Sequence, residues 1–213
     1  MRLVLASNNA KKLLEMRALL QGLPVELLAQ GELGIPEAEE PHLTFLENAL
    51  AKARHAARAS GGAAIADDSG LCVRALGGAP GVISAHFAEL PGGAGAFAGD
   101  REAQRRAQDA ANNALLLQRL AGCDNRRAAF VSTLVALRHA DDPEPLVAFG
   151  RWPGRILEAP SGAGGFGYDP LMFIPELGLS VAELDAATKN AHSHRARAAS
   201  QMRQLLQEAW TLG

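Results

Sequence analysis

A short apolar run leads directly into two adjacent acids in residues 63–70, Ala-Ala-Ile-Ala-Asp-Asp-Ser-Gly. Ala63–Ala66 has the pattern of a short buried strand, and the polar residues after it predict the turn that ends it. Acids at the carboxyl edge of a strand are well placed to bind a divalent cation through oxygen and to activate a water. The alternative is a turn that only ends the strand.

Strand and helix patterns alternate on both sides of this segment. Further strands are predicted at 3–6, 25–29, 130–137, 146–149 and 171–174. Helices are predicted at 12–20, from Thr44 to the glycines at 61–62, at about 101–120, and after Ser193. This order indicates an α/β fold with an elongated mixed sheet flanked by helices. We expect a single domain over residues 1–213, formed by two lobes with a central cleft.

Two of these helices have a predicted buried face. Thr44 and Glu47 have the spacing of a capping box. In the helix that follows them, Lys52 is expected to lie away from an apolar stripe formed by Leu46, Ala49, Leu50, Ala53 and Ala57. In the helix at 101–120, close packing is predicted for Ala103, Ala107, Ala110, Ala114 and Leu117.

Composition excludes several classes of partner. The 213 residues have a formal net charge of −2 and a hydrophobic fraction of 48%. This balance gives no electrostatic attraction to nucleic acid polymers, but a few local cations can still hold a small phosphorylated substrate. Cys72 and Cys123 are expected to be buried or half-buried thiols rather than a disulfide or a metal pair. No targeting signal or membrane-spanning run is present, so a cytoplasmic protein without a membrane partner is expected.

Two more segments have side chains suited to phosphate or metal. Residues 7–12 read Ser-Asn-Asn-Ala-Lys-Lys and lie between a predicted strand and helix. Main-chain N–H groups at a helix start bind phosphate oxygens, and lysine adds charge. The alternative is a capped polar turn with two surface lysines. Residues 37–40, Glu-Ala-Glu-Glu, could complete a metal site with Asp68 or form a solvated acidic loop.

Two late segments could hold a base. Residues 164–170 place Phe166 and Tyr168 among glycines, which favours either stacking on a flat ligand or packing of both rings into the core. Residues 189–195 would present cationic donors at the start of the last helix, or only a solvated basic surface. A zinc site at His192 and His194 is rejected, because residues two apart do not share a helix face.

Together these features form the inventory of a Mg²⁺-dependent enzyme acting on a nucleotide. The glycine–lysine pattern of a P-loop is absent from the sequence. Over nearly its whole length the chain resembles the family of non-standard purine nucleoside triphosphate pyrophosphatases. The matching motifs are residues 7–12, 44–49, 66–70, 76–81, 165–170 and 193–195. The resemblance implies hydrolysis of dITP, ITP and XTP to the monophosphate and pyrophosphate, with Mg²⁺ as cofactor and a homodimer as the assembly.

The resemblance also implies residue roles. Asp68 would be the general base and a metal ligand, helped by Glu40 or its neighbour Glu39. Ser69 would touch the substrate. The triphosphate would be contacted by Ser7, Asn8, Asn9, Ala10, Lys11 and Lys12. The base would be sandwiched and read by Phe166, Gly167, Tyr168 and Asp169. The purine and its oxygens would be held by Lys189, His194 and Arg195.

The sequence departs from the family pattern in two places, and these differences are expected to affect the rate of turnover but not the reaction catalysed. His86 stands where the family usually has arginine, and residues 89–99 are unusually rich in glycine and alanine. If this region gates the cleft, turnover could differ. Two other functions stay open: a hydrolase of modified pyrimidine triphosphates, and a nucleotide sensor without turnover.

Overall fold

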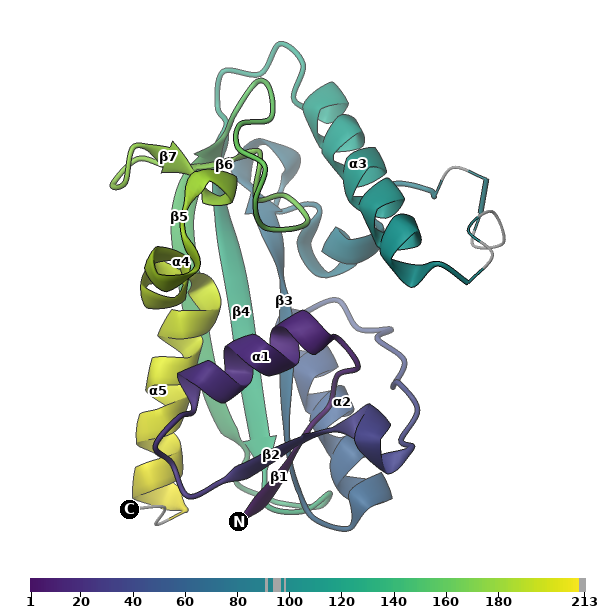
Figure 1. Ribbon diagram of the computed structural model, residues 1–213, viewed down its shortest axis with the longest axis vertical. Helices are drawn as coiled ribbons and strands as arrows, with labels where there is room; N and C mark the ends of the chain where they lie inside the picture. The colour runs from purple at the N-terminus through teal and green to yellow at the C-terminus, as the bar shows by residue number, and fades with distance from the viewer. Residues whose placement is uncertain (91, 94–96, 98, 211–213) are drawn as a thin grey trace. The chain divides into compact units, whose positions relative to one another are not determined.

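The computed structural model describes residues 1–90, 92–93, 97 and 99–210, apart from the side chain of Lys11. The elements in chain order are shown in Figure 1: β1 (Arg2–Leu5), α1 (Ala10–Leu19), β2 (Glu26–Ala29), η1 (Gln30–Leu33), α2 (Phe45–Ser60), β3 (Ala63–Val73), η2 (Arg74–Leu76), η3 (Gly81–His86), α3 (Arg101–Arg119), β4 (Arg127–Leu137), β5 (Leu146–Ile156), β6 (Met172–Ile174), β7 (Leu179–Ser180), η5 (Val181–Glu183), α4 (Ala186–His192) and α5 (His194–Ala209).

One mixed sheet contains the seven strands in the order β2-β1-β3-β4-β5-β6-β7. Strand β1 is parallel to both β2 and β3, whereas β6 is antiparallel to β5 and β7. The predicted α/β fold with a mixed sheet flanked by helices is therefore confirmed.

The chain forms two compact units. Unit 1 comprises Met1–Ser69, Val131–Arg151 and Asn190–Gly213, and unit 2 comprises Gly70–Phe130 and Trp152–Lys189. The single domain with a central cleft stays a prediction.

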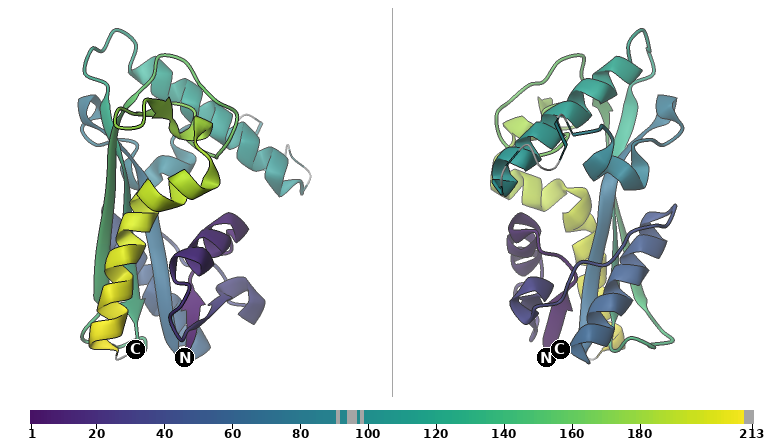
Figure 2. Two further views of the ribbon diagram at one scale, coloured as in Figure 1. Left: turned by 60° about the vertical axis from the view of Figure 1, so that its left-hand side comes forward. Right: turned by 90° about the vertical axis from the view of Figure 1, so that its right-hand side faces the viewer.

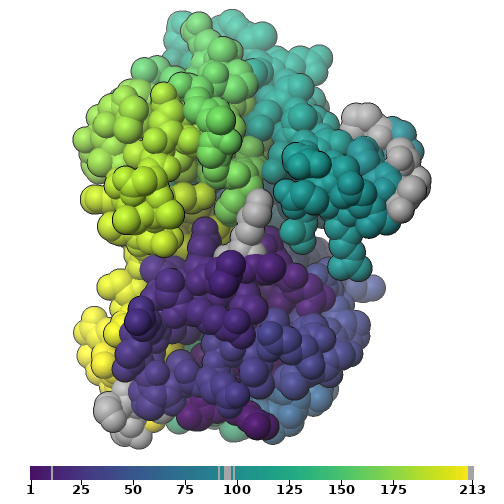
Figure 3. All heavy atoms as spheres, in the orientation of Figure 1, coloured from purple at the N-terminus to yellow at the C-terminus, as the bar shows by residue number. Residues whose placement is uncertain are grey.

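Helices cover both faces of the sheet in unit 1. Successive strand side chains point to opposite faces. Leu5 and Ile65 therefore pack with α1 and α5, whereas Val4 and Ala64 pack with α2. Figure 2 shows α1 and α2 on opposite sides of β3, and in Figure 3 the purple atoms of the first helix and its neighbours cover the sheet. Leu13 and Met16 of α1, and Leu20 just after it, are buried against this face.

Strand β3 does not end at Ala66, as the sequence indicated. It continues through both acids to Val73. An Asp-Asp-Ser-Gly segment predicts a turn because its side chains usually need water, but here both carboxylates find cations inside unit 1, as described below. Buried polar groups that have partners do not interrupt a strand.

The inward face of α2 is wider than predicted. Thr44 caps the helix as expected, accepting a hydrogen bond from the main-chain N–H of Glu47 at 3.2 Å. Its alanines at 49, 53, 56 and 57 are buried. However, Leu46 is 38% exposed, and Lys52, which was expected to lie away from the stripe, is buried. The small alanine side chains leave space for the long lysine stem, and its ammonium reaches a carboxylate.

The predicted inward face of α3 is only partly confirmed, because Leu117 packs against the core and Ala103 and Ala107 are half-buried. Ala110 and Ala114 are exposed, and the buried side chains are Asn112, Leu116 and Leu120. Alanine has little surface to bury, so two leucines and a hydrogen-bonding asparagine decide which side of the helix faces inward.

Unit 2 has its own core, in which Leu71, Trp152 and Met172 are almost fully buried. Cys72 and Cys123 are free and half-buried, as predicted. No helix among the described residues is long and apolar enough to cross a membrane.

Gly150 of β5 permits the first turn of α5 to approach the strand. A Cβ built at this position would overlap the carbonyl oxygen of His194 and lie 2.7 Å from the main-chain nitrogen of Ala198. Main chain on both sides cannot move as a flexible side chain can. Gly150 therefore fixes how closely the helix packs.

We predict that Gly150→Ala lowers the free energy of unfolding by about 1–3 kcal/mol, the usual range for overpacking. Urea denaturation followed by circular dichroism measures this loss. Gly62→Ala is the matched control, because a Cβ there meets no atom within 4 Å. Equal stability of the two variants would contradict the predicted close approach.

Candidate functional site

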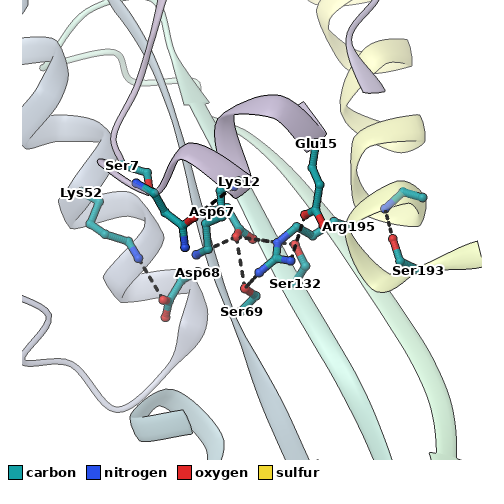
Figure 4. Close-up of polar contacts among 12 residues, drawn as sticks. Ser7, Lys12, Glu15, Lys52, Asp67, Asp68, Ser69, Ser132, Ser193 and Arg195 are labelled. Atoms are coloured by element: carbon teal, nitrogen blue, oxygen red, sulfur yellow. Dashed lines mark hydrogen bonds and ion pairs between the residues drawn. The ribbon is translucent and has the colours of Figure 1, made fainter. Parts of the chain in front are cut away.

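Asp67 is the centre of a buried polar network in unit 1, and its side chain is 2% exposed. Its Oδ2 lies 3.0 Å from Nζ of Lys12 and 3.1 Å from Nε of Arg195. Ser132 donates to Oδ1 at 2.7 Å, and Ser69 donates to Oδ2 at 3.1 Å. Figure 4 shows these side chains converging from α1, β3, β4 and α5. Burial alone would raise the pKa of Asp67, but Lys12, Arg195 and the Ser132 hydroxyl hold it well below the ordinary value.

Arg195 links three segments of unit 1. Besides Asp67, its guanidinium donates to Glu15 on α1 at 3.1 Å and to Ser69 on β3 at 2.9 Å. The helix that carries it begins as predicted, with Ser193 accepting a hydrogen bond from the N–H of Ala196 at 3.1 Å. These contacts give Arg195 a structural role. Its expected contact with a purine stays a prediction.

Asp68 forms its ion pair with a different residue from those that pair with Asp67. Its Oδ1 accepts from Nζ of Lys52 at 2.9 Å, and the same ammonium lies 3.2 Å from Oε1 of Glu40. The other oxygen, Oδ2, is buried and has no hydrogen-bond partner within the described part of the chain. A buried carboxylate oxygen without a partner is unfavourable, so this atom is poised for a ligand or a proton.

The two neighbouring aspartates have opposite pKa shifts. Burial raises the pKa of Asp68 above the ordinary value despite the opposing charge of Lys52. Burial alone would lower the pKa of Lys52, but the carboxylates of Asp68 and Glu40 raise it, which keeps the lysine charged. Asp67 is thus a fixed anion, whereas Asp68 has an increased proton affinity. Environments that separate the pKa values of two acids assign them different chemical roles.

The turn at residues 7–12 begins α1 beside this network. Asn9 accepts a hydrogen bond from the N–H of Lys12 at 3.3 Å, and Ser7 accepts from the N–H of Asn9 at 3.2 Å. Asn8 and Ala10 are exposed, and the Oδ1 of Asn8 lies 2.6 Å from where a Cβ on Gly31 would stand. The side chain of Lys11 lies outside the described structure. The contact of Lys12 with Asp67 places the predicted phosphate turn next to the aspartate pair.

The carboxylates near Lys52 suit Mg²⁺. Among residues 1–90, 92–93, 97 and 99–210, no three His, Cys, Asp or Glu side chains form a cluster that could hold a metal. Mg²⁺ does not need one, because it is usually bound by one or two carboxylates together with substrate phosphates and waters. The free Oδ2 of Asp68 and the 44% exposed carboxylate of Glu40 match that requirement. Glu39 is exposed.

Unit 2 contains the predicted aromatic loop. Asp169 accepts from the N–H of Phe166 at 2.9 Å and from Nζ of Lys189 at 2.7 Å. The same ammonium stands 4.5 Å from the centre of the Phe166 ring. Gly165 has a φ of +74°, and a Cβ there would collide with Asp169. The loop therefore folds tightly around a buried carboxylate, with a phenyl ring and an ammonium side by side.

Tyr168 follows the core alternative given for its ring, whereas Lys189 and His194 have other surroundings than the sequence indicated. Tyr168 is 5% exposed in the core of unit 2, and its hydroxyl donates to the carbonyl of Ser84 at 2.9 Å. Lys189 was placed at the start of the last helix, but it belongs to the separate helix α4 in unit 2. His194, at the start of α5 in unit 1, is buried. The break between these helices follows from the capping geometry of Ser193.

Sequence reasoning missed several polar residues around these groups. Lys52 follows Ala49 by three residues and precedes Ala56 by four, so helical spacing alone would have placed it on the buried side. Ser132 and Glu15 carry no comparable signal, because their partners are distant in sequence. His86, the departure noted above, is exposed at the end of η3, and residues 91, 94–96 and 98 of the adjoining segment lie outside the described structure.

Comparisons with known proteins agree along the whole chain. The model of the Ham1 family matches residues 3–205. A dITP/XTP pyrophosphatase of Methylibium petroleiphilum is 68% identical over 99% of both chains, and one of Leptothrix cholodnii is 67% identical over the full length of both. The structure of a HAM1 protein from Coxiella burnetii has a TM-score of 0.85 at 40% identity, covering 98% of this chain and 99% of that one.

We predict that Asp67→Asn lowers the free energy of unfolding at pH 7 by about 3–5 kcal/mol, since it leaves buried cations without their counter-charge. Because the pKa of Asp67 is lower in the folded chain, its ionised carboxylate stabilises the fold at any pH above the unfolded-state pKa of about 3.9. This contribution is lost as the pH falls from about 3.9 through the lower pKa of the folded state. Urea denaturation between pH 3 and 7 should therefore show a shallower acid decline in the variant than in the wild type.

Asp141→Asn is the control, because Asp141 is 91% exposed and its ion pair with Arg58 lies on the surface. If Asp67→Asn were as stable as this control, the network around Asp67 would not hold unit 1 together.

Proposed function

We propose that this chain, which belongs to the Ham1 family, hydrolyses dITP, ITP and XTP to the nucleoside monophosphate and pyrophosphate. Its full-length relatives at 67–68% identity are dITP/XTP pyrophosphatases, and the chain is accordingly a nucleoside triphosphate pyrophosphatase. The observation that carries the proposal is the buried, unpartnered Oδ2 of Asp68 beside the Lys52–Glu40 pair. Such hydrolysis removes deaminated purines from the nucleotide pool.

We assign the triphosphate to the segment from Ser7 to Lys12. The start of α1 offers main-chain N–H groups and the positive end of a helix dipole. The ammonium of Lys12 is held by Asp67, so its position is set before substrate arrives. The hydroxyl of Ser69 is assigned a further contact with the substrate.

Asp68 and Glu40 would hold Mg²⁺. When bound there, Mg²⁺ would neutralise phosphate charge and lower the pKa of a coordinated water. Lys52 keeps the two carboxylates near each other through its contacts of 2.9 and 3.2 Å, and its raised pKa keeps it cationic next to a phosphate chain.

The reaction forms a bond from water oxygen to the α-phosphorus and breaks the bond to the bridging oxygen, so that pyrophosphate leaves. The water proton goes to Asp68, whose raised pKa suits a general base. Asp67 cannot replace it, because its carboxylate is engaged by Lys12, Arg195 and two hydroxyls.

We assign recognition of the base to unit 2. Phe166 offers a ring for stacking, and Lys189 offers a charged donor for a 6-keto oxygen. Adenine carries an amino group at that position and would leave the donor facing another donor. A buried polar mismatch costs about 1–3 kcal/mol, so two mismatches give strong discrimination. Gly167 and Asp169 shape the loop, and His194 and Arg195 remain candidates for further contacts.

A homodimer and a cytoplasmic location are also proposed, from the family resemblance. Sedimentation velocity of the purified chain measures the first directly. A monomer at micromolar concentration would contradict it.

The proposed reaction predicts pyrophosphate release from dITP and XTP in the presence of Mg²⁺, with much slower release from dATP, dGTP and dUTP. An enzyme-coupled pyrophosphate assay measures this. Faster turnover of dUTP would favour the pyrimidine alternative, and tight dITP binding without product would favour a sensor. Release of orthophosphate would show that a different bond is cleaved.

Asp68→Asn is predicted to lower kcat by about 10²–10⁴-fold, the usual contribution of a general base. Its melting temperature should stay near that of the wild type, since Lys52 keeps Glu40 as a partner. Near-normal turnover in this variant would overturn the assignment of the base.

Two neighbouring variants separate the proposed metal ligands. Glu40→Gln should raise the Mg²⁺ concentration for half-maximal turnover about tenfold or more, whereas Glu39→Gln should leave it unchanged. The reverse result would assign the second ligand to Glu39.

A further inference from the structure

Helix α3 carries two polar pairs along its buried side. Gln108 and Asn112 contact the segment after η3: Asn112 accepts from the N–H of Ala88 at 2.8 Å, and Gln108 donates to the Ala88 carbonyl at 2.8 Å. Asp109 and Asn113, one residue further along, face the aromatic loop instead. Neither residue of this second pair is among the groups assigned to the substrate or to Mg²⁺.

Asp109 and Asn113 hold Gly167 by both of its main-chain groups. The N–H of Gly167 donates to Oδ2 of Asp109 at 2.8 Å, and its carbonyl accepts from Nδ2 of Asn113 at 2.9 Å. Residues that are four apart lie on the same helix face, so the pair grips one peptide segment from one side.

The residues next to Gly167 are fixed as well. The N–H of Phe166 donates to Asp169, and the hydroxyl of Tyr168 donates to the carbonyl of Ser84. Three consecutive residues therefore have specified positions in unit 2. The direction of the Phe166 ring depends on both ends of this segment.

The side chain of Asn113 lowers the stability of the folded chain at one of its two polar atoms. Its Oδ1 is buried and has no hydrogen-bond partner among the residues that the structure describes. A buried acceptor without a partner is destabilising, and an apolar side chain would avoid it. The amide is therefore best explained by what its Nδ2 does, which is to hold the Gly167 carbonyl.

We propose that Asp109 and Asn113 are positioning residues that preorganise the Phe166 ring for the base of the substrate. This inference rests on the proposed function. The loop contains Gly162, Gly164, Gly165 and Gly167, which leave the free chain many conformations. Ordering such a loop on binding would weaken affinity, and a loop already held by α3 avoids that loss. The pair should act on KM for the nucleotide, with little effect on kcat.

Two isosteric variants and two truncations test the pair. Asp109→Ala and Asn113→Ala should raise KM for dITP about threefold to tenfold, as expected for one hydrogen bond, with kcat within about twofold of the wild type. Asp109→Asn keeps an acceptor for the Gly167 N–H and should restore KM to within about twofold. Asn113→Asp has the same shape but loses the donor and places a carboxylate against the Gly167 carbonyl, so it should raise KM at least as much as Asn113→Ala.

Asp100→Ala is the control for a merely structural effect. Asp100 caps α3 by accepting from the N–H groups of Glu102 and Ala103, and it takes no part in holding the loop. It should lower the melting temperature and leave KM unchanged. Amide hydrogen exchange at 166–168 gives a readout that does not depend on activity, with faster exchange expected in both alanine variants.

Wild-type turnover with unchanged KM in Asp109→Ala and Asn113→Ala would overturn the inference. It would also be overturned if Asp100→Ala raised KM as much as these two variants do, because the effect would then follow from loss of stability. An inactive wild-type chain would overturn the proposed function and the KM role with it. In that case unchanged exchange at 166–168 would also show that α3 does not hold the loop.

Discussion

The buried carboxylate of Asp67 is the interaction on which unit 1 depends. An unpaired ion at 2% exposure would be strongly unfavourable. Here the charge is balanced by Lys12 from α1 and Arg195 from α5, while Ser132 of β4 contributes a hydroxyl. The same contacts that make the ion tolerable also fasten two helices to the middle of the sheet. In this unit, the contacts that neutralise the buried charge are therefore also contacts that hold the tertiary structure together.

This arrangement frees Asp68 for chemistry. Because Asp67 binds the neighbouring cations of the α1–α5 face, Asp68 on the other face has Lys52 and Glu40 as its charged neighbours. The carboxylate of Asp67 is fully occupied by structural contacts, whereas Oδ2 of Asp68 has no hydrogen-bond partner among the described residues. The loop at 164–169 in unit 2 shows the same division of roles. Asp169 holds the main chain of the loop, while the Phe166 ring stays half-buried.

Local signals in the sequence predicted much of the fold. The first strand, helix α1 and the caps at Thr44 and Ser193 depend on neighbouring residues and are confirmed. The errors concern the end of β3, where a distant partner overrides local preference, and the faces of α3 and α2, where the spacing of alanines was weighted over that of Leu116 and Lys52. The end of β3 could not be placed without knowing that Arg195, 128 residues away, neutralises Asp67. Motif order indicated the site residues, but the separate surroundings of the two aspartates depend on partners that are distant in sequence.

The alternation of side chains along β3 makes the site sensitive to the spacing of its residues. The pairs Leu3↔Ala63 and Leu5↔Ile65 fix the register of β3 on β1. Because side chains alternate between the two faces, odd-numbered and even-numbered residues further along the strand point to opposite faces of the sheet. Losing or gaining one residue between Ile65 and Asp67 would exchange the surroundings of the two acids while leaving composition almost unchanged. Substitutions that conserve the volume of the buried residues Ala64, Ile65 and Ala66 would therefore keep this arrangement, whereas a change in the spacing would not.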